Sequence, residues 1–171
     1  SSSSAASDVY KRQEGVGFEK KVVGSESMGE GSRFKKEVEM KLCSPLHFFG
    51  CLAEATDLPI MIYNNPVAYN LDLSPGDFTQ LERYENIVAV KDSSHDSRRM
   101  TDMINACGDR FSLFCGVDDR ALENFVCGAV GWVSGMTNAF PRESVRLFDL
   151  AQSKRIEEAV ELYRWIMPVL H

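Results

Sequence analysis

The chain reads Ile60-Met61-Ile62-Tyr63-Asn64-Asn65-Pro66 and then, after a turn and a helix signal, Ile87-Val88-Ala89-Val90-Lys91-Asp92-Ser93-Ser94. Each run is a short apolar β-type segment that ends in a functional group, a phenol in the first and an amine in the second. Only one βα unit separates the two groups, so a parallel sheet would place both at its carboxyl edge. That edge is where α/β folds hold their sites.

Lys91 is a candidate amine nucleophile, because an amine at the end of a buried strand is desolvated and its charged form is disfavoured. Imine-forming lysines are activated in this way, and they need a nearby acid or base to move protons. Tyr63 is the candidate for that group. A structural alternative exists for each residue: Lys91 can extend its ammonium group to solvent, and Tyr63 can cover the core as an amphipathic lid.

Bulk composition limits the classes of function. A chain of 171 residues is long enough for one domain with a core, and 44% hydrophobic and 26% charged residues are ordinary for a globular protein. The net charge of -6, without a basic stripe, argues against nucleic-acid binding. Neither an apolar run of about 20 residues nor a signal-like leader is present, so we expect a cytoplasmic protein with no membrane partner.

The cysteine and histidine spacing predicts neither a metal site nor a disulfide framework. The five cysteines are odd in number and show no C-x-x-C pair, and His47, His95 and His171 are scattered. Buried, reduced thiols are the expectation. We assign no metal and no cofactor.

Residues 1–42 differ in character from the rest. Residues 1–7 are of low complexity, and residues 15–41 are dominated by Gly, Ser, Glu and Lys, so a disordered or non-native segment is predicted. Residues 8–13 look like the translation of a transposon end used in sequencing libraries, and we interpret residues 1–13 as an assembly artefact. Residues 43–171 are predicted to form the catalytic domain.

From Ser44 onward, helix and strand signals alternate. Ser44-Pro45 and Ser74-Pro75 are helix starts, and Gly108 is a helix stop. The predicted helices are 44–57, one beginning at 74, 97–107, a short one around 121–126, 141–152, and 155–167 ending before Pro168; the predicted strands are 60–63, 87–90, 111–115 and 130–134. This alternation indicates a parallel sheet of four βα units, half of an eight-stranded barrel. A doubly wound open sheet is the alternative, but its usual Gly-rich phosphate loop is missing.

Four runs in this order resemble the dihydrodipicolinate synthase / N-acetylneuraminate lyase family over about residues 44–171: Tyr63-Asn64-Asn65-Pro66, Val90-Lys91-Asp92-Ser93-Ser94, Gly116-Val117-Asp118-Asp119 and Gly131-Trp132-Val133-Ser134-Gly135. Such members are TIM (β/α)8 barrels that bind a 2-keto acid as a Schiff base. The resemblance implies that this chain is the C-terminal half, strands five to eight, of such an α/β barrel. It implies an inactive fragment of a homo-oligomeric parent.

The resemblance also implies roles for single residues. Lys91 would form the imine and Tyr63 would relay protons, while Ser134 and Gly135 would lie near the substrate carboxylate. Gly116 would line the pocket and Ser93 would face it. The alternative for these last four is that they are turn residues selected for backbone shape.

Two features separate the chain from the synthases of this family. The Gly-Thr-Thr-Gly carboxylate loop of the family's first strand is not in this sequence, and Ala68 stands where synthases carry an arginine for a second carboxylated substrate. Residues 63–69 and the ending 163–171 are most similar to members that deaminate 1-pyrroline-4-hydroxy-2-carboxylate to 2-oxoglutarate semialdehyde in hydroxyproline catabolism. An aldolase of 2-keto-3-deoxy sugar acids, a dihydrodipicolinate synthase and a non-catalytic α/β module stay open as alternatives.

Overall fold

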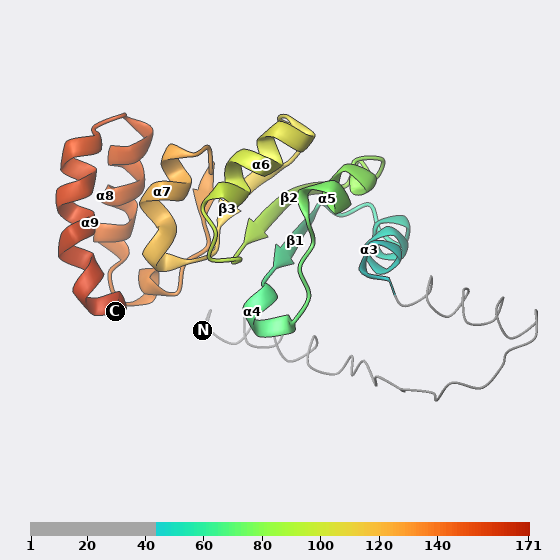
Figure 1. The fold of residues 1–171 in the computed structure, drawn as a ribbon, viewed down its shortest axis with the longest axis horizontal. Helices are drawn as coiled ribbons and strands as arrows, with labels where there is room; N and C mark the ends of the chain where they lie inside the picture. The colour runs from blue at the N-terminus through green and yellow to red at the C-terminus, as the bar shows by residue number, and fades with distance from the viewer. Residues whose placement is uncertain (1–43) are drawn as a thin grey trace, which may run out of the picture. The chain divides into compact units, whose positions relative to one another are not determined.

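A computed structural model describes residues 44–171, so the prediction for residues 1–42 lies outside the described part. Helices and strands alternate along it (Figure 1). The elements are α3 (Pro45–Glu54), β1 (Ile60–Asn64), α4 (Pro66–Tyr69), α5 (Pro75–Leu81), β2 (Ile87–Asp92), α6 (Arg98–Cys107), β3 (Ser112–Cys115), η1 (Asp118–Arg120), α7 (Ala121–Val126), β4 (Gly131–Trp132), η2 (Met136–Asn138), α8 (Pro141–Gln152) and α9 (Ile156–Leu170).

The four strands form one parallel sheet in the order β1-β2-β3-β4. Neighbouring strands are therefore also consecutive in the sequence, which confirms the predicted succession of βα units. All four carboxyl ends meet at one edge. The loops that follow the strands are consequently neighbours in space.

Local sequence signals explain where the helices begin and end. The Ser44 side chain accepts a hydrogen bond from the His47 amide and caps α3. Ser74 and Asp77 form a reciprocal capping box at the start of α5. Helix α6 ends at Gly108, whose φ of 59° favours glycine.

The two faces of the strands differ in burial. Ile62 of β1 and Ile87 of β2 are fully buried in the core that the helices complete, together with Phe78 of α5. Met61 and Val88, on the same strands, are 42% and 40% exposed. These apolar side chains are thus left partly uncovered, and they are of the type that normally faces a barrel interior.

Several predicted boundaries were wrong. Strand β4 contains only Gly131–Trp132, because the chain turns at Ser134 into η2, where the Thr137 amide bonds the Ser134 hydroxyl. Pro168 does not end the last helix: α9 continues to Leu170. A proline near a helix end removes one hydrogen bond, and the chain resumes the ladder when the His171 amide donates to the Met167 carbonyl.

The cysteines match the prediction only in part. Cys51, Cys107, Cys115 and Cys127 are free thiols, but only Cys115 is buried, and Cys51 is exposed on α3. Burial raises the pKa of the Cys115 thiol, which keeps it protonated and unreactive.

Within residues 44–171, no helix is long and apolar enough to cross a bilayer.

Candidate functional site

The site is built on the carboxyl ends of β1 and β2. Tyr63 and Lys91 are register partners on these two strands, and Lys91 lies inside β2 rather than after it. Partners on adjacent parallel strands point to the same face of the sheet. The Lys91 Nζ lies 3.9 Å from the centroid of the Tyr63 ring. Amine and phenol thus share one half-buried environment.

Gly116 gives the Lys91 side chain its room. A Cβ at this position would lie 2.8 Å from Lys91 Cε and 2.9 Å from the Asp92 carbonyl oxygen, and it would overlap the Ser93 hydroxyl. The Gly116 amide donates a 2.8 Å hydrogen bond to that same carbonyl, which fixes the close approach. Only glycine fits here without displacing Lys91 or Ser93.

Ser93 contributes an unused polar group beside the amine. Its side chain is 4% exposed, and Ser93 Oγ has no hydrogen-bond partner among the described residues. An unbonded buried hydroxyl is costly and calls for an explanation. A bound polar ligand would satisfy it.

The Tyr63 hydroxyl is held from the loop after β1. Asn65 Nδ2 donates a 2.8 Å hydrogen bond to Tyr63 Oη, and the Tyr69 ring packs edge-on against the Tyr63 ring at 5.9 Å. The phenol therefore occupies a defined position at the edge of the sheet.

A cavity of about 430 Å³ opens at this edge. Tyr63, Ser93 and Gly116 line it, and Lys91 adjoins it through its contacts with Tyr63 and Gly116. The remaining lining residues are Asn65, Val67, Ala68, His95, Val117, Asp118, Asp119 and Leu170. The structure thus brings four of the six predicted residues together.

Ser134 and Gly135, the other two predicted residues, follow β4 at the same edge but do not line this cavity. Asp118 connects their turn to the cavity: its two carboxylate oxygens accept from Trp132 Nε1 at 3.1 Å and from the Met136 amide at 2.9 Å. Asp118 therefore joins the loop after β3 to the turn after β4.

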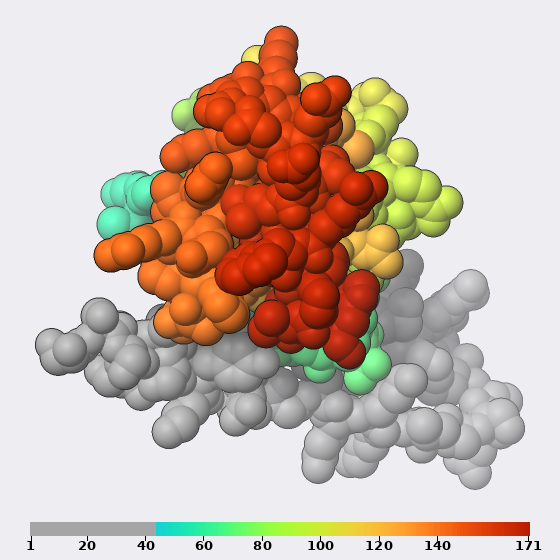
Figure 2. Space-filling model, turned by 90° about the vertical axis from the view of Figure 1, so that its left-hand side faces the viewer, coloured from blue at the N-terminus to red at the C-terminus, as the bar shows by residue number. Residues whose placement is uncertain are grey.

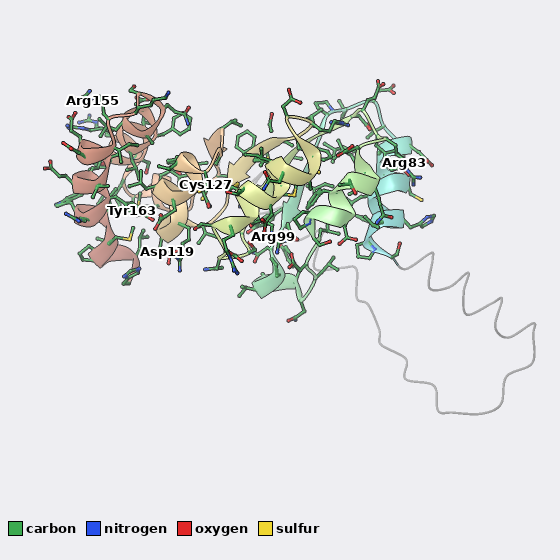
Figure 3. The ribbon with its side chains drawn as sticks, turned by 45° about the horizontal axis from the view of Figure 1, so that its top comes forward. Arg83, Arg99, Asp119, Cys127, Arg155 and Tyr163 are labelled. Atoms are coloured by element: carbon green, nitrogen blue, oxygen red, sulfur yellow. The ribbon has the colours of Figure 1, made fainter. Side chains whose placement is uncertain are left out.

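A polar network supports the edge from the helix side. Asn64 donates to Asp92 and to Asp72, and it accepts from the Leu73 amide. Arg99 of α6, which Figure 3 labels, forms an ion pair with Asp72 at 2.7 Å. These bonds hold the segment after α4 against the strands that carry Tyr63 and Lys91.

Sequence reasoning assigned no role to Asn65, Asp118 or Asp119. Each stands in one of the runs that carried the family resemblance, so position in a motif was the available signal. Their hydrogen-bond partners could not be deduced without coordinates.

In the described part of the chain, no three His, Cys, Asp or Glu side chains gather as metal ligands would.

A larger hollow of about 690 Å³ lies along α8 and the start of α9, the helices that face the viewer in Figure 2. Exposed residues including Arg142, Arg146 and Arg155 line it. It contains no buried unbonded polar atom, whereas the smaller cavity adjoins Ser93. We therefore place the candidate site at the Tyr63–Lys91 edge.

Comparison with known proteins gives matches over most of the described chain. The family model described as Dihydrodipicolinate synthetase family matches residues 40–171. A 4-hydroxy-tetrahydrodipicolinate synthase of Exiguobacterium sibiricum is 34% identical over 122 residues, 71% of this chain and 42% of that protein. A probable mitochondrial 4-hydroxy-2-oxoglutarate aldolase of Emericella nidulans is 34% identical over 115 residues, 67% of this chain and 37% of that protein.

The fold is also similar to solved structures. The chloride-inhibited dihydrodipicolinate synthase of Acinetobacter baumannii, crystallised with pyruvate, superposes with a TM-score of 0.69 at 29% identity, covering 72% of this chain and 43% of that one. The chain thus spans less than half the length of these relatives. The match confirms the prediction that the parallel sheet is half of a TIM (β/α)8 barrel.

Proposed function

The chain belongs to the dihydrodipicolinate synthetase family, and on that premise we propose that its parent protein is a class I lyase that binds its substrate as a Schiff base on Lys91. The observation that carries the proposal is the pairing of Lys91 with Tyr63 at the carboxyl edge of the sheet. The pyruvate in the A. baumannii synthase supports a small 2-keto acid, or the corresponding cyclic imino acid, as the substrate class.

The two side chains divide the chemistry between them. Lys91 Nζ, as the neutral amine, attacks the carbon next to the substrate carboxylate. Tyr63 Oη gives a proton to the departing oxygen or nitrogen and takes one back in a later step. The Ser93 hydroxyl, which has no partner in the described chain, is available to bond a substrate oxygen. Ser134 and Gly135 would lie near the carboxylate.

Within this class we propose deamination of 1-pyrroline-4-hydroxy-2-carboxylate. Lys91 adds to C2 and opens the ring, and a proton leaves C3 as the 4-hydroxyl leaves as water. Proton shifts from C5 to C3 and from the nitrogen to C4 then convert the resulting C3=C4 bond into an imine at C5. Hydrolysis of the two imines frees the lysine and ammonia. The sum is substrate plus one water giving 2-oxoglutarate semialdehyde plus ammonia. The reaction belongs to the breakdown of hydroxyproline.

The charge of the described cavity wall supports a substrate with one carboxylate. Asp118 and Asp119 are the acidic side chains that line it, and apart from the adjoining amine of Lys91, His95 is the only lining side chain that can become cationic. Ala68 provides no charge at the position where synthases hold an arginine. A second substrate carboxylate would meet like charge on this wall, whereas a hydroxyl group could donate to it.

An aldolase is the second candidate, because the Emericella nidulans relative is described as a probable 4-hydroxy-2-oxoglutarate aldolase. Purified full-length parent protein separates the candidates when it is given each substrate in turn. Release of ammonia and semialdehyde from the pyrroline compound supports the deaminase. Pyruvate release from a 4-hydroxy-2-keto acid, without ammonia release from the pyrroline compound, would refute the deaminase proposal and support the aldolase.

A further inference from the structure

We propose that Asn65 is a positioning residue for the acid/base step, because it donates a hydrogen bond that sets the direction of the Tyr63 hydroxyl. The inference deepens the proposed function and rests on it for the role of Tyr63. It assigns a task to a side chain that lies in a family motif but to which neither the sequence nor the comparisons gave a role.

The orientation of the Asn65 amide is determined from both of its ends. Its Oδ1 accepts from the Ala68 amide at 3.2 Å as the N-cap of α4, and its Nδ2 donates to Tyr63 Oη at 2.8 Å. The reversed amide would place an NH₂ group against the N–H of Ala68, where two donors would face each other. Asn65 is therefore a donor to the phenol oxygen.

The backbone around Asn65 keeps this donor in place. Pro66 occupies the first helical position of α4, where its fixed φ suits the helix and its missing N–H costs nothing. The Tyr69 amide closes the turn on the Asn65 carbonyl at 3.0 Å. Asn65 follows Tyr63 by only two residues, so its side chain is within reach of the phenol. The one-turn helix α4 fixes the Asn65 backbone and keeps its side-chain amide at the Tyr63 hydroxyl.

The hydrogen bond from Asn65 determines what the Tyr63 hydroxyl can do. Since the phenol oxygen already accepts from Asn65, its own O–H is left to donate into the cavity that Tyr63 and Asn65 both line. The amide thus orients the proton of the phenol toward the cavity.

Two substitutions in the full-length parent protein separate this role from helix capping. Asn65→Ser and Asn65→Asp both keep an oxygen that can cap α4 through the Ala68 amide. Neither presents a donor to the phenol: serine is too short to reach it, and aspartate offers only acceptors. Asn70→Gly is the matched control, because it changes the left-handed residue at the other end of the same helix and leaves Asn65 intact.

The first readout is the split between KM and kcat. We expect KM of both Asn65 variants to stay within about twofold of the wild-type value, because Lys91 and Ser93 keep their places, and both constants to stay unchanged in Asn70→Gly. A KM that rises as much as kcat falls, in a folded Asn65→Ser protein, would overturn the proposal.

The second readout is the size of kcat. We expect kcat of both Asn65 variants to fall about 10- to 100-fold, a part of what loss of a general acid/base costs. Equal kcat in wild type and variants would overturn the proposal while leaving Lys91 chemistry intact. Absence of any borohydride adduct in the wild type would instead refute the proposed function and, with it, this role of Asn65.

Discussion

Lys91 Nζ lies 3.9 Å from the centre of the Tyr63 ring, and the two residues are register partners on adjacent parallel strands. The position over the ring face suits a charged ammonium group, which the ring attracts. Attack on a carbonyl or imine carbon needs the neutral amine instead. In the proposed reaction, Lys91 Nζ therefore has to turn from the ring toward the cavity to meet the substrate carbon.

Replacement of Tyr63 by phenylalanine tests the proton relay. The ring and its contact with Lys91 remain, and only the hydroxyl is lost. We expect turnover of the full-length parent to fall by about 10² to 10⁴, the range for a general acid/base, while Lys91 still forms a trappable adduct more slowly. Steady-state kinetics and mass spectrometry check the two parts. Wild-type turnover would make Tyr63 purely structural.

Gly116→Ala tests the space around the amine. The added methyl group would press on Lys91 Cε and on Ser93, so we expect adduct formation to slow at least tenfold and stability to fall by about 1–3 kcal/mol. Gly76→Ala is the matched control, because its nearest neighbour, Ser74 Oγ, lies at 3.7 Å, an ordinary contact. Urea titration and adduct yield measure the effects. Equal behaviour of the two alanine variants would contradict the packing described around Lys91.

Asp118 tests whether the turn after β4 belongs to the site. Asp118→Ala removes the acceptor of both Trp132 Nε1 and the Met136 amide, and Trp132→Phe removes only the first bond. At about 1 kcal/mol for each bond, we expect KM for the substrate to rise more in Asp118→Ala than in Trp132→Phe, by roughly thirtyfold and fivefold, with smaller changes in kcat. Unchanged KM in both variants would remove this turn from the carboxylate site.

The exposed side of the sheet predicts how the 171-residue chain behaves alone. Met61 and Val88 are each about two-fifths exposed, so each forgoes a corresponding part of the roughly 1.5–3 kcal/mol that full burial of such a side chain contributes. We expect this chain to self-associate in gel filtration and to show no turnover, in contrast to the full-length parent. A monomer that unfolds cooperatively and converts substrate would contradict this expectation.

Local signals predicted much of the architecture. Ser44 and Ser74 cap helices as expected, and the strand-end phenol and amine proved to be register partners. The length of β4 and the passage of α9 through Pro168 could not be predicted in this way, because neighbouring elements and the remaining helix ladder outweigh local propensity there.

The hydrogen bonds within the site could not be predicted from the sequence either. The bond from Asn65 to Tyr63 and the two bonds to Asp118 depend on how loops fold back on one another. The motifs marked these residues, but a motif gives residue types and spacing and does not specify partners. Ser134 and Gly135 show the same limit. Their motif predicted a position at this edge of the sheet, and it could not tell that neither residue lines the cavity.

The most direct test of the account is reductive trapping on the full-length parent protein. Sodium borohydride is added in the presence of pyruvate or the pyrroline substrate, and peptide mass spectrometry then locates the modified residue. A covalent adduct on Lys91, lost in Lys91→Arg and retained at a reduced rate in Tyr63→Phe, is the predicted result. An adduct on another lysine, or turnover without any adduct, would contradict the assignment of Lys91 as the imine-forming amine.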